Sequence, residues 1–187
     1  TGKGGGRQVR REIRLSGYGG QGLILAGIIL AEAAMHDGHE AVQTQSYGPE
    51  ARGGASKAEV IISDEPIDYP KVTAPDVLLL MSDAACKRYA CTVEPGGTLI
   101  VDSGLVGNVP ENRGVVHTIP ITDVSVEATG RAITANIAAL GVLNTVAKLV
   151  SPESLEKAIA ARAPRGTVEI NMKAFRAGVD AAQKAGK

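Results

Sequence analysis

The chain has 187 residues, 44% of them hydrophobic, and its 20 basic and 20 acidic residues give no net charge at pH 7; this size usually makes one compact domain. Its longest apolar run, residues 23–34, is shorter than the roughly 20 residues of a membrane span, and it has no signal peptide, so we expect a cytoplasmic protein without membrane contact. Residues 1–11 hold four basic residues and no acidic one, so the rest of the chain has a net charge of −4. Only 3% of the residues are aromatic. The chain therefore lacks the positive field and the stacking surfaces that nucleic-acid binding uses.

The first 11 residues differ in composition from the rest of the chain. They contain four glycines and four basic residues, and they offer almost nothing to bury. Such a composition is typical of disorder. We therefore predict a disordered tail over residues 1–11 and a single domain over residues 12–187.

The domain begins with a strand, a glycine turn and a helix. Residues 12–16 have the pattern of a short strand, and residues 17–22, GYGGQG, interrupt it. Residues 23–35 are apolar, rich in Ala, Leu and Ile, and long enough for a helix. Gly38 then stands where a left-handed residue commonly ends a helix.

The rest of the chain alternates strand and helix patterns. Short runs rich in β-branched residues or leucine predict buried strands at residues 40–45, 57–63, 76–82, 98–102 and 114–121. Helices are predicted at residues 83–93, from residue 125 onward with a long helix at 131–150, from Ser151-Pro152, and at 168–184. The pattern predicts a three-layer, Rossmann-like α/β domain with a mostly parallel sheet and a helical C-terminal part.

The predicted helix at residues 131–150 has apolar residues on more than one face. Ile133 and Ile137 belong to this set. A helix of this kind is covered on two sides. Either its own domain or a partner subunit would provide the second cover.

The glycine turn has the spacing G-x-G-x-x-G. After a strand and before a helix, this spacing lets backbone amides approach a phosphate at the positive end of the helix. The second strand of a dinucleotide site should end in an acidic residue, however, and here it ends in Gln45. The alternative is that these glycines only permit a tight turn and close packing. The candidate binding residues of this turn are Gly17, Gly19, Gly20, Gln21 and Gly22.

The segment at residues 46–56, SYGPEARGGAS, fits neither a helix nor a strand. Its glycines and proline favour a shaped loop that presents polar side chains outward. Arg52 is suited to bidentate binding of a phosphate or carboxylate; the alternative is an ordinary surface pair with Glu50. The candidate binding residues of this loop are Tyr47, Gly48, Glu50, Arg52, Gly53, Gly54 and Ser56.

The two motifs together resemble a known family. GYGGQG at residues 17–22, followed by SYGPEARGG at 46–54, is similar to the gamma domain of the pyruvate and 2-oxoacid:ferredoxin oxidoreductases. The resemblance continues at residues 66–67, 96–103 and 171–178, and at Asn136 and Gly141. It covers nearly the whole chain after residue 11, and its general character favours the 2-oxoglutarate type.

The resemblance implies a reaction that this chain does not perform alone. Such complexes join a 2-oxoacid and coenzyme A to give acyl-CoA, carbon dioxide and reduced ferredoxin. Thiamine diphosphate, Mg²⁺ and [4Fe–4S] clusters carry this chemistry in partner subunits of the alpha, beta and delta types. Cys86 and Cys91 lack the spacing of cluster ligands and are interpreted as small, buried hydrophobic residues of a helix, so we expect neither a metal nor a cofactor on this chain alone.

Within such a complex, we expect the two motifs to lie at a subunit junction near the thiamine and coenzyme A pocket. Arg52 is the candidate for direct contact with substrate or a CoA phosphate. Two other classes of function stay open at this point: a free-standing NAD- or nucleotide-binding protein, and a purely structural subunit. The isolated chain would be a monomer or a homodimer.

Overall fold

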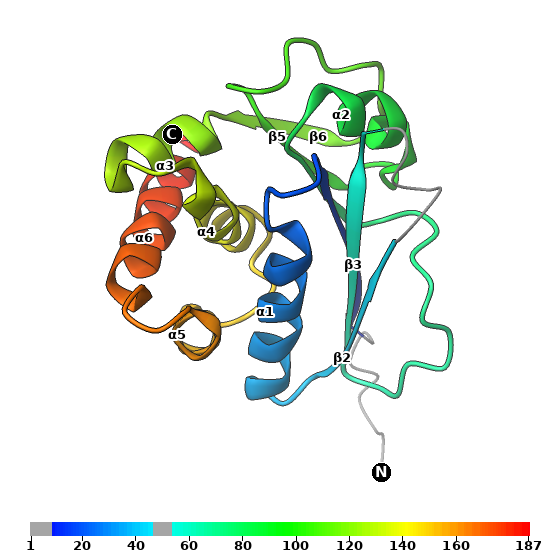
Figure 1. Ribbon diagram of the computed structural model, residues 1–187. Coiled ribbons are helices and arrows are strands. Elements are labelled where there is room, and N and C mark those ends of the chain that lie inside the picture. Colours follow the sequence, from blue (N-terminus) through cyan, green and yellow to red (C-terminus); the bar gives the residue numbers. More distant parts are fainter. Residues whose placement is uncertain (1–8, 47–53) are drawn as a thin grey trace.

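The chain forms a six-stranded sheet flanked by helices in a computed structural model that describes residues 9–46 and 54–187 (Figure 1). In space, the strands follow the order β2-β3-β1-β4-β5-β6. Their bounds are β1 Arg10–Gly17, β2 Glu40–Gln45, β3 Ser56–Ser63, β4 Val77–Leu80, β5 Thr98–Asp102 and β6 Val115–Ile119.

The sheet is mostly parallel, as predicted, with one reversed strand. β1, β4, β5 and β6 pair in parallel, whereas β3 is antiparallel to both of its neighbours, β1 and β2. The pattern had not indicated which strand is reversed. Only ten residues separate Gln45 from Ser56, and a parallel crossover needs a dozen or more. The chain therefore turns back at this point.

Helices cover both faces of the sheet, so the predicted three-layer α/β fold with a helical C-terminal part is confirmed. One face carries most of them, as Figure 1 shows: α1 Leu23–His36, α3 Ile121–Thr129, α4 Ala135–Ala147, α5 Pro152–Arg162 and α6 Val168–Ala185. The other face carries α2 Asp83–Tyr89 and the 3-10 helix Ala90–Thr92. No helix within the described ranges is both long and apolar enough to cross a membrane.

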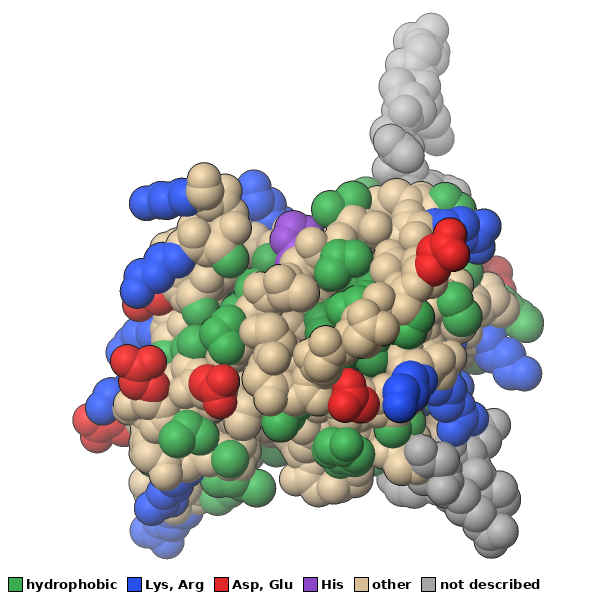
Figure 2. Space-filling model, turned by 90° about the horizontal axis from the view of Figure 1, so that it is seen from above, with side chains coloured by type: hydrophobic (Ala, Val, Ile, Leu, Met, Phe, Trp, Pro, Cys, Tyr) green, Lys and Arg blue, Asp and Glu red, His purple; other side chains and the backbone are tan. Residues whose placement is uncertain are grey.

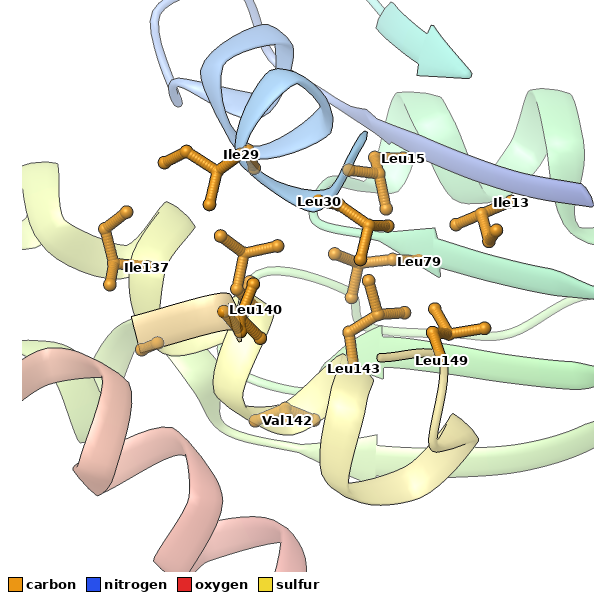
Figure 3. Packing of buried hydrophobic residues seen from close by; sticks show 14 of the residues in the cluster. Ile13, Leu15, Ile29, Leu30, Leu79, Ile137, Leu140, Val142, Leu143 and Leu149 are labelled. Carbon is orange, nitrogen blue, oxygen red and sulfur yellow. The ribbon is translucent and has the colours of Figure 1, made fainter. Parts of the chain in front are cut away.

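The core is divided by the sheet into two clusters. On the side of the larger helical layer, Ile13 and Leu15 of β1 meet Leu30 of α1 and Leu143 of α4 (Figure 3). The second cluster lies under α2 and contains Leu78, Leu80, Leu99 and Val101. Because successive residues of a strand point to opposite faces, β4 contributes to both clusters. Burial on both faces explains why β4 is nearly all leucine.

Two predicted boundaries near the ends of β1 and β6 were wrong. β1 begins at Arg10 and pairs with β3 along its whole length, so the predicted tail boundary after residue 11 lies too late; residues 1–8 are outside the described residues. The strand predicted at 114–121 ends at Ile119, and the helix expected from residue 125 already begins at Ile121. Pro120 separates the two because it cannot donate to a ladder and is tolerated where a helix starts.

The long helix predicted at 131–150 is shorter than expected. It consists of a 3-10 helix, Ala132–Thr134, followed by α4, which ends where Lys148 adopts a left-handed conformation with φ 50°. Asn144 stabilises this end, since its side-chain oxygen accepts bonds from the amides of Leu149 and Val150, both at 3.0 Å. The predicted start of the next helix at Ser151-Pro152 is confirmed, with Ser151 as its N-cap.

A polar cluster joins the end of α1 to the start of α5. The carboxylate of Asp37 accepts bonds from the amide of Ser151 at 2.6 Å and from the hydroxyls of Ser151 and Ser154. Burial raises the pKa of Asp37. The hydrogen bonds from Ser154 and Ser151 and the charge of His39 lower it by more, so the net pKa is below the ordinary value of 3.8. The folded chain therefore favours the charged carboxylate.

The Asp37 cluster makes stability depend on acid pH. Because the folded pKa is the lower one, its contribution is fully present above pH 3.8 and is lost as the pH falls through the folded pKa. We expect Asp37→Asn to be less stable than wild type by about 1 kcal/mol at neutral pH. Urea unfolding of both proteins over a pH series checks this: the difference should shrink on acidification, and a constant difference would contradict it.

Candidate functional site

The glycine turn, residues 17–22, connects β1 to α1 at the carboxyl edge of the sheet. β1 and β4 are parallel neighbours and end side by side at this edge, where open α/β sheets commonly bind ligands. Figure 2 views the molecule from this side, and its middle consists mainly of hydrophobic and uncharged atoms. β1, the turn and α1 follow one another as the sequence predicted.

Gln21 holds the turn in shape. Its Oε1 accepts a bond from the amide of Tyr18 at 2.6 Å, and its Nε2 donates to the carbonyl of Met81 at 2.9 Å. Met81 directly follows β4, so this side chain bridges the ends of the two strands. The motif predicts only a backbone role for Gln21, and nothing in its spacing indicates the side-chain bridge.

The glycines of the turn serve different purposes. Gly20 and Gly22 have φ of 90° and 76°, in the left-handed region that favours glycine. A Cβ at Gly17 would collide with the Gln21 side chain. Gly19 is different: its φ lies outside the left-handed region, and a Cβ placed there would meet nothing within 4 Å. The described fold therefore does not require glycine at position 19.

The segment at residues 46–56 ends at Ser56, directly against the glycine turn. Ser56 pairs with Gly17 in the β1–β3 ladder. Its hydroxyl lies 3.3 Å from the carbonyl of Gly17 and 3.5 Å from that of Tyr18, and its own carbonyl accepts a bond from Ser16 at 2.7 Å. The structure thus brings the predicted residue Ser56 together with the predicted turn.

The remaining residues of the loop divide into two groups. Gly54 is described and has φ 76°, and Ala55 is buried with the cluster under α2. The other candidate residues of this loop lie outside the described residues: Tyr47, Gly48, Glu50, Arg52 and Gly53.

The acidic side chains at the carboxyl edge have structural partners. Asp102 is fully buried and accepts bonds from the amide of Gly104 and from the amide and hydroxyl of Thr122, the last at 2.6 Å. Asp83 accepts a bond from the amide of Gly107 at 3.0 Å. These carboxylates fix local loops and the start of α3.

Neither the cysteines nor the described acidic and histidine residues form a metal site. Within residues 9–46 and 54–187, no three His, Cys, Asp or Glu side chains converge as metal ligands. Burial, aided by the charge of Asp83, raises the pKa of the Cys86 thiol. Cys91 is exposed, so its interpretation as a buried residue was wrong. A [4Fe–4S] cluster takes four thiolates, and the chain has two cysteines.

The strand order argues against a dinucleotide site at the turn. In such a site the second strand lies beside the first, and an acid at its end reaches the ribose. Here β3 lies between β1 and β2, which places β2 about 10 Å from β1 at the usual strand spacing. β2 also ends in Gln45. The free-standing NAD-binding alternative is therefore not supported.

A cavity beside the turn was missed by the sequence analysis. It measures about 230 Å³ and is lined by Gly22 together with residues of α1, α4, α5 and α6. Its lining is mainly apolar, with Ile29, Ile137 and Ile159 among the residues. The apolar second face of the region 131–150 was the one sequence feature that pointed to the cavity, but it does not specify which other helices complete it.

Comparisons with known proteins agree over nearly the whole chain. Residues 12–181 match the family model described as pyruvate ferredoxin/flavodoxin oxidoreductase. The chain is 51% identical over 180 residues to the 2-oxoglutarate synthase subunit KorC of Methanocaldococcus jannaschii, covering 95% of this chain and 96% of that protein.

Solved structures share the fold. The gamma subunit of a keto/oxoacid ferredoxin oxidoreductase from Geobacter sulfurreducens aligns with a TM-score of 0.85 and 48% identity, over 93% of this chain and 99% of that one. A 2-oxoglutarate:ferredoxin oxidoreductase from Magnetococcus marinus aligns with a TM-score of 0.82 and 22% identity, and there the match covers 96% of this chain but 32% of the other. The same fold thus occurs both as a separate chain and within a longer one.

Proposed function

The chain belongs to the pyruvate ferredoxin/flavodoxin oxidoreductase family, and we propose that it is the gamma subunit of a 2-oxoacid:ferredoxin oxidoreductase of the 2-oxoglutarate type. The observation that carries the proposal is the match to separate subunits of such enzymes over almost the full length of both chains. The contact between Ser56 and the glycine turn supports it, because Ser56 ends the segment 46–56 that contains the second motif and lies against the first motif at one edge of the sheet.

In this proposal the complex converts a 2-oxoacid and coenzyme A to acyl-CoA and carbon dioxide and passes electrons to ferredoxin in the cytoplasm. Thiamine diphosphate with Mg²⁺ and [4Fe–4S] clusters would supply decarboxylation and electron transfer from the alpha, beta and delta-type subunits. Two cysteines, one of them buried, do not fit a cluster on this chain. Its contribution is therefore to position groups at a subunit junction.

The residues that we propose for this positioning lie on the two motifs. Around Gly19 and Gly20 the turn is open, since a Cβ at either position would meet nothing within 4 Å. Open glycines allow a ligand or another backbone to approach closely. We propose that these backbone groups and the neighbouring loop contact coenzyme A or the subunit that holds it, with Arg52 as the group that binds an anion.

The variant Gly19→Ala tests the turn. Since its added methyl group meets nothing in this chain, we expect the free energy of unfolding of the isolated chain to change by less than about 0.5 kcal/mol. The 2-oxoacid-dependent turnover of the assembled complex should fall several-fold, because the methyl group obstructs the close approach. As a control, Gly22→Ala should destabilise the isolated chain itself, because Gly22 has a φ of 76° and an added Cβ would collide with the Asn136 side chain.

Turnover of the Gly19→Ala complex equal to wild type would refute contact at the turn and would favour a purely structural subunit. Chemical unfolding of the isolated chains and steady-state assays of the complexes give the two readouts. The Gly22→Ala result shows whether the unfolding assay is sensitive enough to detect strain in this turn.

The variant Arg52→Ala tests the loop. Loss of a bidentate guanidinium contact should leave the complex assembled but lower its turnover by about tenfold. Arg52→Lys keeps the charge without the planar fork and should give an intermediate rate. Assembly is followed by size-exclusion chromatography and turnover by dye reduction with CoA and a 2-oxoacid. An unchanged rate for Arg52→Ala would exclude the proposed anion contact.

A further inference from the structure

The cavity beside the glycine turn opens on the helical side of the molecule. Its apolar lining comes from four helices, whose arrangement Figure 1 shows: Leu25 and Ile29 of α1, Ile137 of α4, Ile159 of α5 and Ile170 of α6. The cavity measures about 230 Å³. This is smaller than the roughly 300–1,000 Å³ typical of small-molecule sites, so it is better suited to a single side chain.

Apolar surface continues outside the mouth of the cavity. Ile133, on the 3-10 helix before α4, lines the opening and is 68% exposed. Val168 is 39% exposed and follows Thr167, another lining residue. A free ligand enclosed by the cavity would leave these residues in water. A protein surface that covers the mouth would bury them together with the side chain that it inserts.

The rim of the cavity is basic. Arg162 and Arg131 both line it. Arg162 is already paired with Glu32 of α1 at 2.6 Å, whereas Arg131 is exposed and forms no ion pair with a described acidic residue. An unmatched positive charge beside an apolar pocket favours a partner that carries a carboxylate next to an apolar residue.

We propose that another subunit of the oxidoreductase complex docks on this face, inserts an aliphatic or aromatic side chain into the cavity and places a carboxylate against Arg131. This inference rests on the proposed function. Gly22 lines the same cavity, and Asn136 donates a bond to its carbonyl at 3.1 Å. A partner docked here would therefore lie directly beside the glycine turn.

The variant Ile133→Asp tests the docking face in the complete complex. Because Ile133 is mostly exposed, its replacement should leave the melting temperature of the isolated chain nearly unchanged. A carboxylate at the mouth should weaken binding of this chain to the remaining subunits by at least about tenfold. Met35→Asp is the matched control, since Met35 is also an exposed apolar residue, 56% exposed, at the far end of α1. It should assemble like wild type.

A second arm tests the charge. Arg131→Glu should weaken assembly, and Arg131→Lys should restore most of it, with binding measured by biolayer interferometry at two salt concentrations. Normal assembly of both Ile133→Asp and Arg131→Glu would overturn the proposal. So would a wild-type homodimer of the isolated chain that Ile133→Asp converts to a monomer while the complex is unaffected, because the occupant would then be a second copy. A wild-type chain that binds no thiamine-diphosphate or iron–sulfur subunit would instead refute the proposed function.

Discussion

Replacing Gly178 by alanine should lower the free energy of unfolding by about 3 kcal/mol or more. Gly178 lies on α6 where this helix crosses α4. A Cβ there would collide with the carbonyl oxygen of Ala138 and lie 2.8 Å from its carbonyl carbon. Gly141 of α4 faces α6 in the same way, since its Cβ would collide with the carbonyl of Phe175. These obstacles are backbone atoms, so the helices would have to move apart.

The sign of the Gly178→Ala effect makes the test decisive. In an exposed helix, glycine to alanine stabilises by about 1 kcal/mol, so destabilisation requires the close crossing. Chemical unfolding of wild type and variant gives the difference in free energy. Gly107→Ala serves as a control, because a Cβ at Gly107 would meet nothing within 4 Å. A Gly178→Ala protein as stable as wild type would contradict the observed approach of α4 and α6.

Removing the acid from a buried ion pair should destabilise the chain by about 3–5 kcal/mol. Arg14 of β1 and Glu59 of β3 are only 5% and 6% exposed, and the Arg14 Nε lies 3.4 Å from the Glu59 Oε1. The guanidinium also donates to the Thr92 hydroxyl and the Val72 carbonyl, and it packs on the ring of Tyr89. Glu59→Leu would leave this charge buried without a carboxylate.

A double-mutant cycle isolates the Arg14–Glu59 interaction. The double variant Arg14→Met, Glu59→Leu should be more stable than the sum of the single losses predicts, because it leaves no unpaired charge. Lys57 also contacts Glu59 at 2.8 Å but is more exposed; Lys57→Met should cost less than about 1 kcal/mol. Strictly additive effects in urea unfolding would contradict coupling between the two buried charges.

The sequence specified the main elements because their signals are local. The strand, glycine turn and helix at residues 12–35 combine a period change with a glycine cluster, and these appear as β1, the turn and α1. The reversal of β3 was predictable in principle from the ten-residue link before Ser56. The end of α4 was not, because it depends on a left-handed Lys148 and on the side-chain bonds of Asn144.

The site was predictable only where its contacts join residues close together in the sequence or residues paired in a recognisable strand ladder. The motif identified the glycines, but the bridge from Gln21 to Met81 joins residues 60 positions apart. The cavity needs α1, α4, α5 and α6 together, and no sequence window contains them all. A buried arginine such as Arg14 is likewise hidden in the sequence, since a charged residue in a strand usually marks a solvent-facing position.

Depletion of this chain from the native complex, followed by assay and add-back without oxygen, shows whether a 2-oxoacid:ferredoxin oxidoreductase requires it as a subunit. The proposal predicts that 2-oxoglutarate- and CoA-dependent reduction of ferredoxin or a viologen dye is lost without the chain and restored with it, and that the chain co-purifies with thiamine-diphosphate and iron–sulfur subunits. Full activity without the chain, or an isolated chain that binds NAD and no such subunit, would contradict it.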